Sequence, residues 1–156
     1  MADTPLTLSI TRFIAAPPAE VWAVMTERQE EWWCPVPWRM TITDMDWRAG
    51  GRCSMVMHGP DGEEMPNNGI FLEVVPGVRW SATDAFTLDG EGRYIPAGPF
   101  MVGTWEIAAA NEGSVDGTRY TATARHWTEE AHQSHADMGF EAGWATCADQ
   151  LAALCE

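Results

Sequence analysis

Turn-forming combinations of glycine with glycine, asparagine, aspartate or proline recur through the middle of the chain, and they constrain the fold more than any other feature. Such residues favour turns and interrupt helices. They occur at GG 50–51, GPDG 59–62, NNG 67–69, PG 76–77, DGEG 89–92 and DG 116–117. Residues 39–127 are therefore predicted to form successive antiparallel strands joined by turns.

The segments between these turns have the composition of β-strands, with many β-branched, aromatic and other apolar residues. They are RMTITDMDW, RCSMVMH, GIFLEVV, VRWSATDAF, FMVGTWEIAA and TRYTATARHW. Residues 6–16 add a further strand, because Leu6, Leu8 and Ile10 alternate with threonine and serine. The sequence thus predicts an antiparallel sheet of about seven strands.

Helices are predicted on both sides of this series of strands. Pro17 and Pro18 end the first strand, and proline suits the first turn of a helix. One or two short helices, beginning with residues 17–28, are predicted before the second strand. At the other end, Thr128 is predicted to cap one long helix that ends near Leu154.

Two glycines interrupt this long C-terminal helix. Gly139 and Gly143 lie four residues apart on one helical stripe, and each costs about 1 kcal/mol relative to alanine. The stripe is therefore predicted to pass close to another element or to border a cavity. A sheet with a helix across one face buries the apolar surface of both. We expect an α+β fold, one domain over residues 1–156, with a ligand cavity between sheet and helix.

Several strings of the sequence resemble one family in the same order along the chain. They are ITRFIAAPPAEVWAVMT, EWWCP, DMDWRAGGRCSMVMHGPDG, GIFLEVVPGVRWSAT and GFEAGWATCADQLAALCE. The chain resembles the activator of heat-shock-protein-90 ATPase homologue family, part of the START-like superfamily that includes polyketide cyclases and birch-pollen-allergen-like proteins. The resemblance implies a helix-grip fold, in which a curved antiparallel sheet wraps around a long C-terminal helix.

The resemblance also implies possible functions. The family includes a co-chaperone domain that stimulates the ATPase of its chaperone, and bacterial single-domain proteins. The chain departs from the family pattern at two positions: Cys34 stands where WWGP has glycine, and Ala148 stands where a large apolar residue is common. Both positions are expected to touch the cavity.

The charge of the chain excludes two classes of partner. It carries 23 acidic and 9 basic residues, all nine of them arginine, for a net charge of −14. Nucleic acids and anionic membrane surfaces require clustered positive charge. We therefore expect neither partner. The sequence does not distinguish a monomer from a homodimer.

The sequence predicts a cytoplasmic protein. The N-terminal residues lack the pattern of a secretory signal, and no stretch approaches about 18 uninterrupted apolar residues, the minimum for a membrane-spanning helix. The four cysteines show neither CxxC nor zinc-site spacing and are predicted to be free thiols in a reducing compartment. They are Cys34, Cys53, Cys147 and Cys155.

Histidines near the final helix are the main candidates for chemistry. Glu129, His132 and His135 follow one another at intervals of three, which could present a metal-binding face, but no matching ligand string occurs elsewhere. An exposed or capping pair of histidines is the preferred interpretation, and neither a metal nor a cofactor is predicted. His126 shares a strand face with Tyr120, Ala122 and Ala124, so it either enters the cavity or forms part of the core.

Arg12 lies on the same face of the first strand as Leu8, Ile10 and Ile14. An arginine whose side chain points into the protein needs a carboxylate partner to balance its charge. Glu73, Asp84 and Glu106 are the candidate partners, and an anchor for an acidic ligand is the alternative interpretation.

The leading hypothesis from the sequence is a domain that binds a small apolar or aromatic molecule between the sheet and the C-terminal helix. Nine tryptophans and nine methionines could line such a cavity. The candidate ligand-binding residues are Trp33, Met57, Trp80, Trp105, His126, Met138 and Trp144.

Two other functions stay open. One is a protein-interaction module of the co-chaperone type, with a chaperone as its partner. The other is a cyclase-like or hydrolytic enzyme that uses His126 and a carboxylate as acid and base. No catalytic residue is predicted, and a non-enzymatic role is preferred.

The string EEWWCPVPW at residues 30–38 concentrates three tryptophans in a segment whose prolines exclude regular structure. We expect it near one mouth of the cavity. One of Trp32 and Trp33 should close that end of the cavity, and the other should cover the core.

Overall fold

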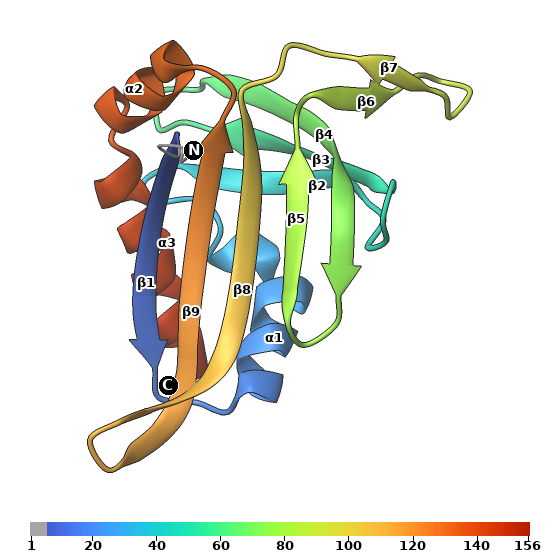
Figure 1. Cartoon of the computed structure of the whole chain (residues 1–156). Helices are drawn as coiled ribbons and strands as arrows, with labels where there is room; N and C mark the ends of the chain where they lie inside the picture. Colours follow the sequence, from blue (N-terminus) through green and yellow to red (C-terminus); the bar gives the residue numbers. More distant parts are fainter. Residues whose placement is uncertain (1–5) are drawn as a thin grey trace, which may run out of the picture.

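The computed structural model describes residues 6–156 and contains one large antiparallel sheet (Figure 1). Seven strands pair in the order β1-β9-β8-β5-β4-β3-β2, so the first and last strands of the sequence are neighbours at one end. The predicted α+β fold and number of strands in this sheet are confirmed. The bounds are β1 Thr7–Ile14, β2 Arg39–Met45, β3 Arg52–His58, β4 Glu64–Val75, β5 Arg79–Thr83, β8 Met101–Glu112 and β9 Val115–His126.

Helices cover one face of this sheet, which gives the helix-grip arrangement (Figure 1). The chain passes from β1 into α1 (Pro18–Glu27) and a short 3-10 helix, η1 (Gln29–Glu31), before β2 begins. After β9 come α2 (Glu129–Asp137) and α3 (Phe140–Cys155), and α3 packs on β1 and α1. Helices after the first strand are thus confirmed. None of the helices in residues 6–156 has the length and apolar character needed to traverse a bilayer.

The core fills the space between α1, α3 and the half of the sheet nearest to them. The alternation of side chains in β1 and β9 directs Ile14, Tyr120 and Ala122 to this side, where all are fully or almost fully buried. Trp32 and Leu151 have no exposed surface and close the core from the helical side. These residues belong to the main apolar core, whose edge at Trp32 and Tyr120 borders a cavity.

The predicted single C-terminal helix is wrong, because Gly139 divides it into α2 and α3. Gly139 has a φ of 92°, the left-handed region that side chains disfavour, and no helix continues through it. Glycine is unfavourable in the interior of a helix, and Gly139 indeed lies where α2 ends and α3 begins. Thr128 does cap α2, as predicted: its side chain accepts a hydrogen bond from the Ala131 amide.

Two turn assignments between the strands are also wrong. Asn67, Asn68 and Gly69 lie inside β4 and pair with β3. Gly69 is needed there for close packing, since a Cβ atom would collide with the carbonyl oxygen of Thr83. Asp116 and Gly117 likewise lie inside β9 and pair with β8. The strand predicted over residues 78–86 also ends early, at Thr83.

Residues 86–96, between β5 and β8, form a separate hairpin that the sequence did not predict. Its strands are β6 (Phe86–Leu88) and β7 (Tyr94–Pro96), which pair with each other and project beyond the main sheet (Figure 1). Tyr94 fastens the hairpin to the main sheet region by donating a 2.6 Å hydrogen bond to the carbonyl of Gly50.

The two glycines of the C-terminal region should respond oppositely to alanine. Gly139→Ala forces a side chain into left-handed backbone and should lower the free energy of unfolding by about 1–2 kcal/mol. Gly143→Ala lies within α3, where its Cβ would meet only Pro35 at 3.9 Å, and should raise stability by about 0.5–1 kcal/mol. Urea denaturation of both variants checks this; equal effects would contradict a break at Gly139.

Candidate ligand-binding cavity

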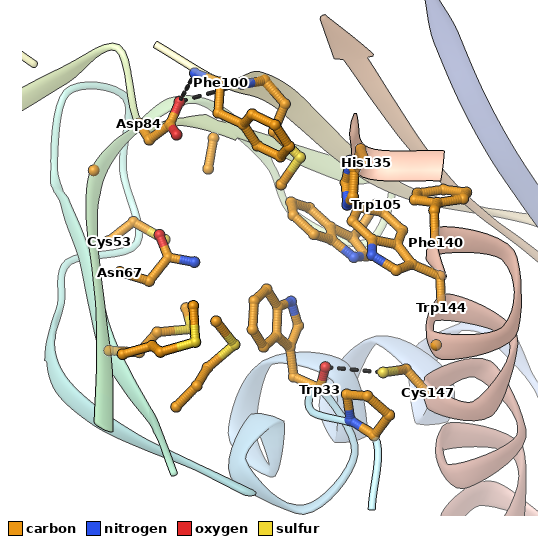
Figure 2. A pocket seen from close by; sticks show the side chains of 18 of the residues that line it. Trp33, Cys53, Asn67, Asp84, Phe100, Trp105, His135, Phe140, Trp144 and Cys147 are labelled. Atoms are coloured by element: carbon orange, nitrogen blue, oxygen red, sulfur yellow. Dashed lines mark hydrogen bonds between the residues drawn. The ribbon is translucent and has the colours of Figure 1, made fainter. Parts of the chain in front are cut away.

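A cavity of about 450 Å³ lies between strands β3, β4, β5 and β8 on one side and helices α2 and α3 on the other (Figure 2). Figure 2 shows two unlike walls facing each other across it. Aromatic rings gather on the side of α3, while Cys53 and Asn67 lie on the strands opposite. Trp33 stands between the two walls. The volume falls in the usual range for small-molecule sites, about 300–1,000 Å³.

The aromatic wall is a continuous stack of rings. Trp105 of β8 stacks on Trp144 of α3 at a centroid distance of 5.6 Å, and Phe140 continues the row at 4.4 Å from Trp144. On its other side Trp105 stacks on Trp80 at 5.5 Å. Trp33 tilts against Trp105 at 6.2 Å. Rings that support one another in this way form a rigid, flat surface.

The opposite wall is rich in sulfur. Cys53, Met55 and Met57 project from one face of β3, and Met65 of the paired strand β4 joins them. Burial raises the pKa of the Cys53 thiol to about 12, so it remains an uncharged, weakly polar group at neutral pH. Methionine side chains adapt their shape readily, so this wall can adjust to different ligands.

The mouth of the cavity lies between β4 and the junction of α2 and α3. Met65 is 47% exposed and Met138 is 68% exposed, although both also line the cavity. Gly139, at the break between the two helices, lines the cavity beside Met138. The break between α2 and α3 therefore forms one edge of the cavity mouth.

Hydrogen bonds from α3 hold the segment that carries Trp33. The Gln150 amide donates to the carbonyls of Trp32 and Cys34, each at 2.9 Å, and its oxygen accepts from the Val36 amide at 3.0 Å. The Cys147 thiol donates to the Trp33 carbonyl at 3.0 Å. Burial, with Cys34 nearby, raises the Cys147 pKa to about 12, so the thiol keeps its proton. These bonds replace the ladder pairing that prolines exclude.

The three tryptophans of residues 30–38 have separate positions. Trp32 is fully buried and donates its indole N–H to the Met25 carbonyl at 3.2 Å. Trp33 forms part of the cavity wall, as one of the two was expected to do, but Trp32 also borders the cavity from within the core. Trp38 is partly buried and packs against a small separate cluster that contains Cys34 and Met40.

The polar contribution to the aromatic side of the cavity comes from His135 of α2. It is 8% exposed, and its Nδ1 lies 2.9 Å from Nε2 of His126. The second ring nitrogen of His126, Nδ1, lies 3.0 Å from the Leu6 carbonyl oxygen. Burial first, and then the neighbouring His126 and His132, lower the pKa of His135 to about 4. The ring is therefore neutral at pH 7.

Five of the seven residues expected to bind a ligand line this cavity: Trp33, Met57, Trp105, Met138 and Trp144. The other two lie one layer behind it. Trp80 is 1% exposed and supports Trp105 from the core, while His126 lies behind His135. Alternation along a strand predicted the face of the sheet on which Trp80 and His126 lie. It could not predict that Trp105 and His135 lie between them and the cavity. The preferred interpretation of His132 and His135 as an exposed or capping pair is wrong for His135, which is buried and lines the cavity; its place three residues after His132 gave no sign of this.

Several other expectations are corrected. Arg12 pairs at 2.9 Å with Asp149 of α3, at the edge of the helix layer, and with none of the three carboxylates proposed. Helix α3 crosses β1 and brings Asp149 there, which strand patterns could not reveal. Cys34 and Ala148 are buried in the packed layers and lie outside the cavity lining.

Within residues 6–156, no group of three or more histidine, cysteine, aspartate or glutamate side chains is arranged to hold a metal ion. His132 and His135 both approach His126, so the histidine cluster is turned toward β9 and β1, where the Thr7 carbonyl lies 3.4 Å from His132. All four cysteines are free.

The comparisons with known proteins agree with this fold. Residues 15–156 match the family model described as activator of Hsp90 ATPase homolog 1-like protein. The chain belongs to this family. No curated protein matches the sequence.

Solved structures of bacterial proteins share this fold. The crystal structure of protein NE0264 from Nitrosomonas europaea is 37% identical, with 98% of this chain and 96% of that chain covered and a TM-score of 0.85. Protein Ms6760 from Mycobacterium smegmatis is 29% identical over 96% of this chain and 90% of its own, with a TM-score of 0.76. The AHSA1 protein SPO3351 from Silicibacter pomeroyi, 20% identical over 94% and 95% of the two chains with a TM-score of 0.68, shares the fold.

Loss of the Gln150 side chain should loosen the wall formed by Trp33. Gln150→Leu leaves the Trp32 and Cys34 carbonyls unpaired and should lower the free energy of unfolding by about 1–3 kcal/mol. Gln133→Leu is the matched control, because Gln133 is exposed and bonds only Asp137 one turn away; we expect a change within about 0.5 kcal/mol. Urea denaturation measures both, and a similar loss in the two variants would contradict this role of Gln150.

Proposed function

We propose that this protein binds a small, largely apolar or aromatic molecule in the cavity between the sheet and helices α2 and α3. The observation that carries the proposal is the lining itself: a stack of aromatic rings faces a methionine-rich wall across about 450 Å³. Water in such a cavity finds few hydrogen-bond partners, so an apolar ligand that displaces it gains free energy. The opening beside Met65 and Met138 offers a route of entry.

Binding without catalysis is favoured by the surroundings of the histidines. An acid and base mechanism through His126 requires a carboxylate within hydrogen-bond reach. In the part of the chain that the structure describes, His126 bonds to His135 and to the Leu6 carbonyl, and both partners are uncharged. Burial keeps the Cys53 thiol protonated, which makes it a poor nucleophile.

The family description names an activator of the Hsp90 ATPase, so a role as a chaperone partner is the second candidate. The cavity favours the ligand-binding role, because a docking function does not require an aromatic-lined volume inside the domain. The two roles separate experimentally, since only the first requires a small molecule to enter the cavity.

A side chain placed into the cavity should block binding. Gly143 lies on α3 at the cavity surface, so the ring of Gly143→Phe would occupy ligand space. We expect 2-naphthol, a small aromatic probe, to quench tryptophan fluorescence saturably in the unmodified protein, and to bind the variant at least about tenfold more weakly, about 1.4 kcal/mol. Trp33, Trp105 and Trp144 are the reporters.

Ala142→Phe is the matched control, since Ala142 is the preceding residue of the same helix and is exposed. It should bind as the unmodified protein does. Circular dichroism and thermal unfolding establish that both variants are folded. Equal affinity in the two folded variants, or no saturable binding to the unmodified protein, would contradict the proposed site; the second result would favour the chaperone role.

A further inference from the structure

His135 places a nitrogen without a protein partner at the aromatic wall of the cavity, whereas the other polar side chains of the lining, Asn67, Thr83 and Asp84, come from β4 and the end of β5. The residue is more than nine-tenths buried and lines the cavity beside Phe140 and Trp144 (Figure 2). Its Nδ1 is bonded to His126. Among the described residues 6–156, Nε2 of His135 has no hydrogen-bond partner. Because this atom is not sealed inside the protein, a hydrogen-bond donor that enters the cavity can reach it, in place of water.

The hydrogen-bond chain behind His135 fixes which nitrogen carries the proton. The Leu6 carbonyl accepts from the backbone amide of His126 at 2.8 Å and faces Nδ1 of the same residue at 3.0 Å. A carbonyl oxygen can only accept, so Nδ1 of His126 bears hydrogen. In the neutral ring, Nε2 of His126 is then an acceptor, and Nδ1 of His135 must donate to it.

Nε2 of His135 therefore keeps a free lone pair, and it lies across the imidazole from Nδ1, the atom that meets His126 behind the cavity wall. The ring stays neutral near pH 7, because burial and the adjacent histidines His126, from β9, and His132, from the same helix, oppose protonation. The other groups in contact with it are the uncharged rings of Phe100, Phe140 and Trp144. The cavity thus presents one fixed acceptor at the end of the aromatic stack.

We propose that the cavity selects aromatic molecules that carry a hydroxyl or N–H group, which donates a hydrogen bond to Nε2 of His135 while the ring packs against the tryptophan stack. This inference rests on the proposed function and adds the chemistry of the ligand. Molecules that offer only acceptors, such as aryl ethers and carboxylates, leave Nε2 unpaired or repel its lone pair, and they are disfavoured.

The selectivity is measured with two probes of nearly equal shape. 2-Naphthol has a hydroxyl donor, whereas 2-methoxynaphthalene has only an acceptor. Titration followed by tryptophan fluorescence at pH 7 should give 2-naphthol at least about tenfold higher affinity. In His135→Phe the ratio should fall to about one, because the acceptor is lost and the aromatic surface is kept.

His58→Phe is the control for this substitution. His58 bonds Thr41 on the face of β3 opposite to the cavity-lining Met57, so the ratio should stay as in the unmodified protein. Equal affinity for both probes in the unmodified protein would overturn the selectivity and leave the binding function intact. Failure of both probes to bind would overturn both.

The proton position can be observed without any ligand, which keeps the inference testable even if His135→Phe does not fold. Long-range 1H–15N correlation spectra distinguish the two neutral tautomers of each imidazole. The structure requires hydrogen on Nδ1 of both His126 and His135 at pH 7. Hydrogen on Nε2 of His135 would make it a donor toward the cavity and would overturn the inference.

Discussion

The hydrogen bonds between α3 and the backbone of residues 32–36 hold the cavity in shape. Pro35 and Pro37 prevent this segment from joining the sheet, so its carbonyls need partners from elsewhere. Cys147 and Gln150 supply them from a single face of the helix. Because that face is also the one that borders the cavity, the same helix positions Trp144 directly and Trp33 through the backbone. The packing of the core and the shape of the cavity wall therefore both depend on the contact between α3 and residues 32–36.

The break at Gly139 adds the polar part of the site. Helix α3 packs on β1, whereas α2 contacts both β9 and β1. The change of direction at Gly139 sets α2 against the end of β9, where His135 meets His126. An aromatic stack carried by α3 and a single acceptor carried by α2 thus reach the cavity from one end of the fold. Apolar area supplies affinity in such a site, and a fixed acceptor on the aromatic side supplies orientation.

The sequence predicts the layers better than the depth of each side chain within them. Alternation and turn residues located the sheet, and the proline-rich segment with its tryptophans indicated one end of the cavity. The same alternation cannot show that Trp105 stands in front of Trp80, or His135 in front of His126, because that order depends on helix placement. The sequence also does not show why a glycine is required at a position. Gly69 leaves room for a neighbouring backbone, whereas Gly139 adopts a left-handed conformation that ends a helix.

Methyl NMR of the nine methionines tests most directly whether this cavity is the binding site. Met55, Met57, Met65, Met101 and Met138 line it, whereas Met25 and Met40 are buried elsewhere. With 13C-methyl methionine and 2-naphthol as the probe, the five cavity methyls should shift saturably, while those of Met25 and Met40 stay in place. Saturable binding that leaves the five cavity methyls unchanged would contradict a ligand site between the sheet and the C-terminal helices.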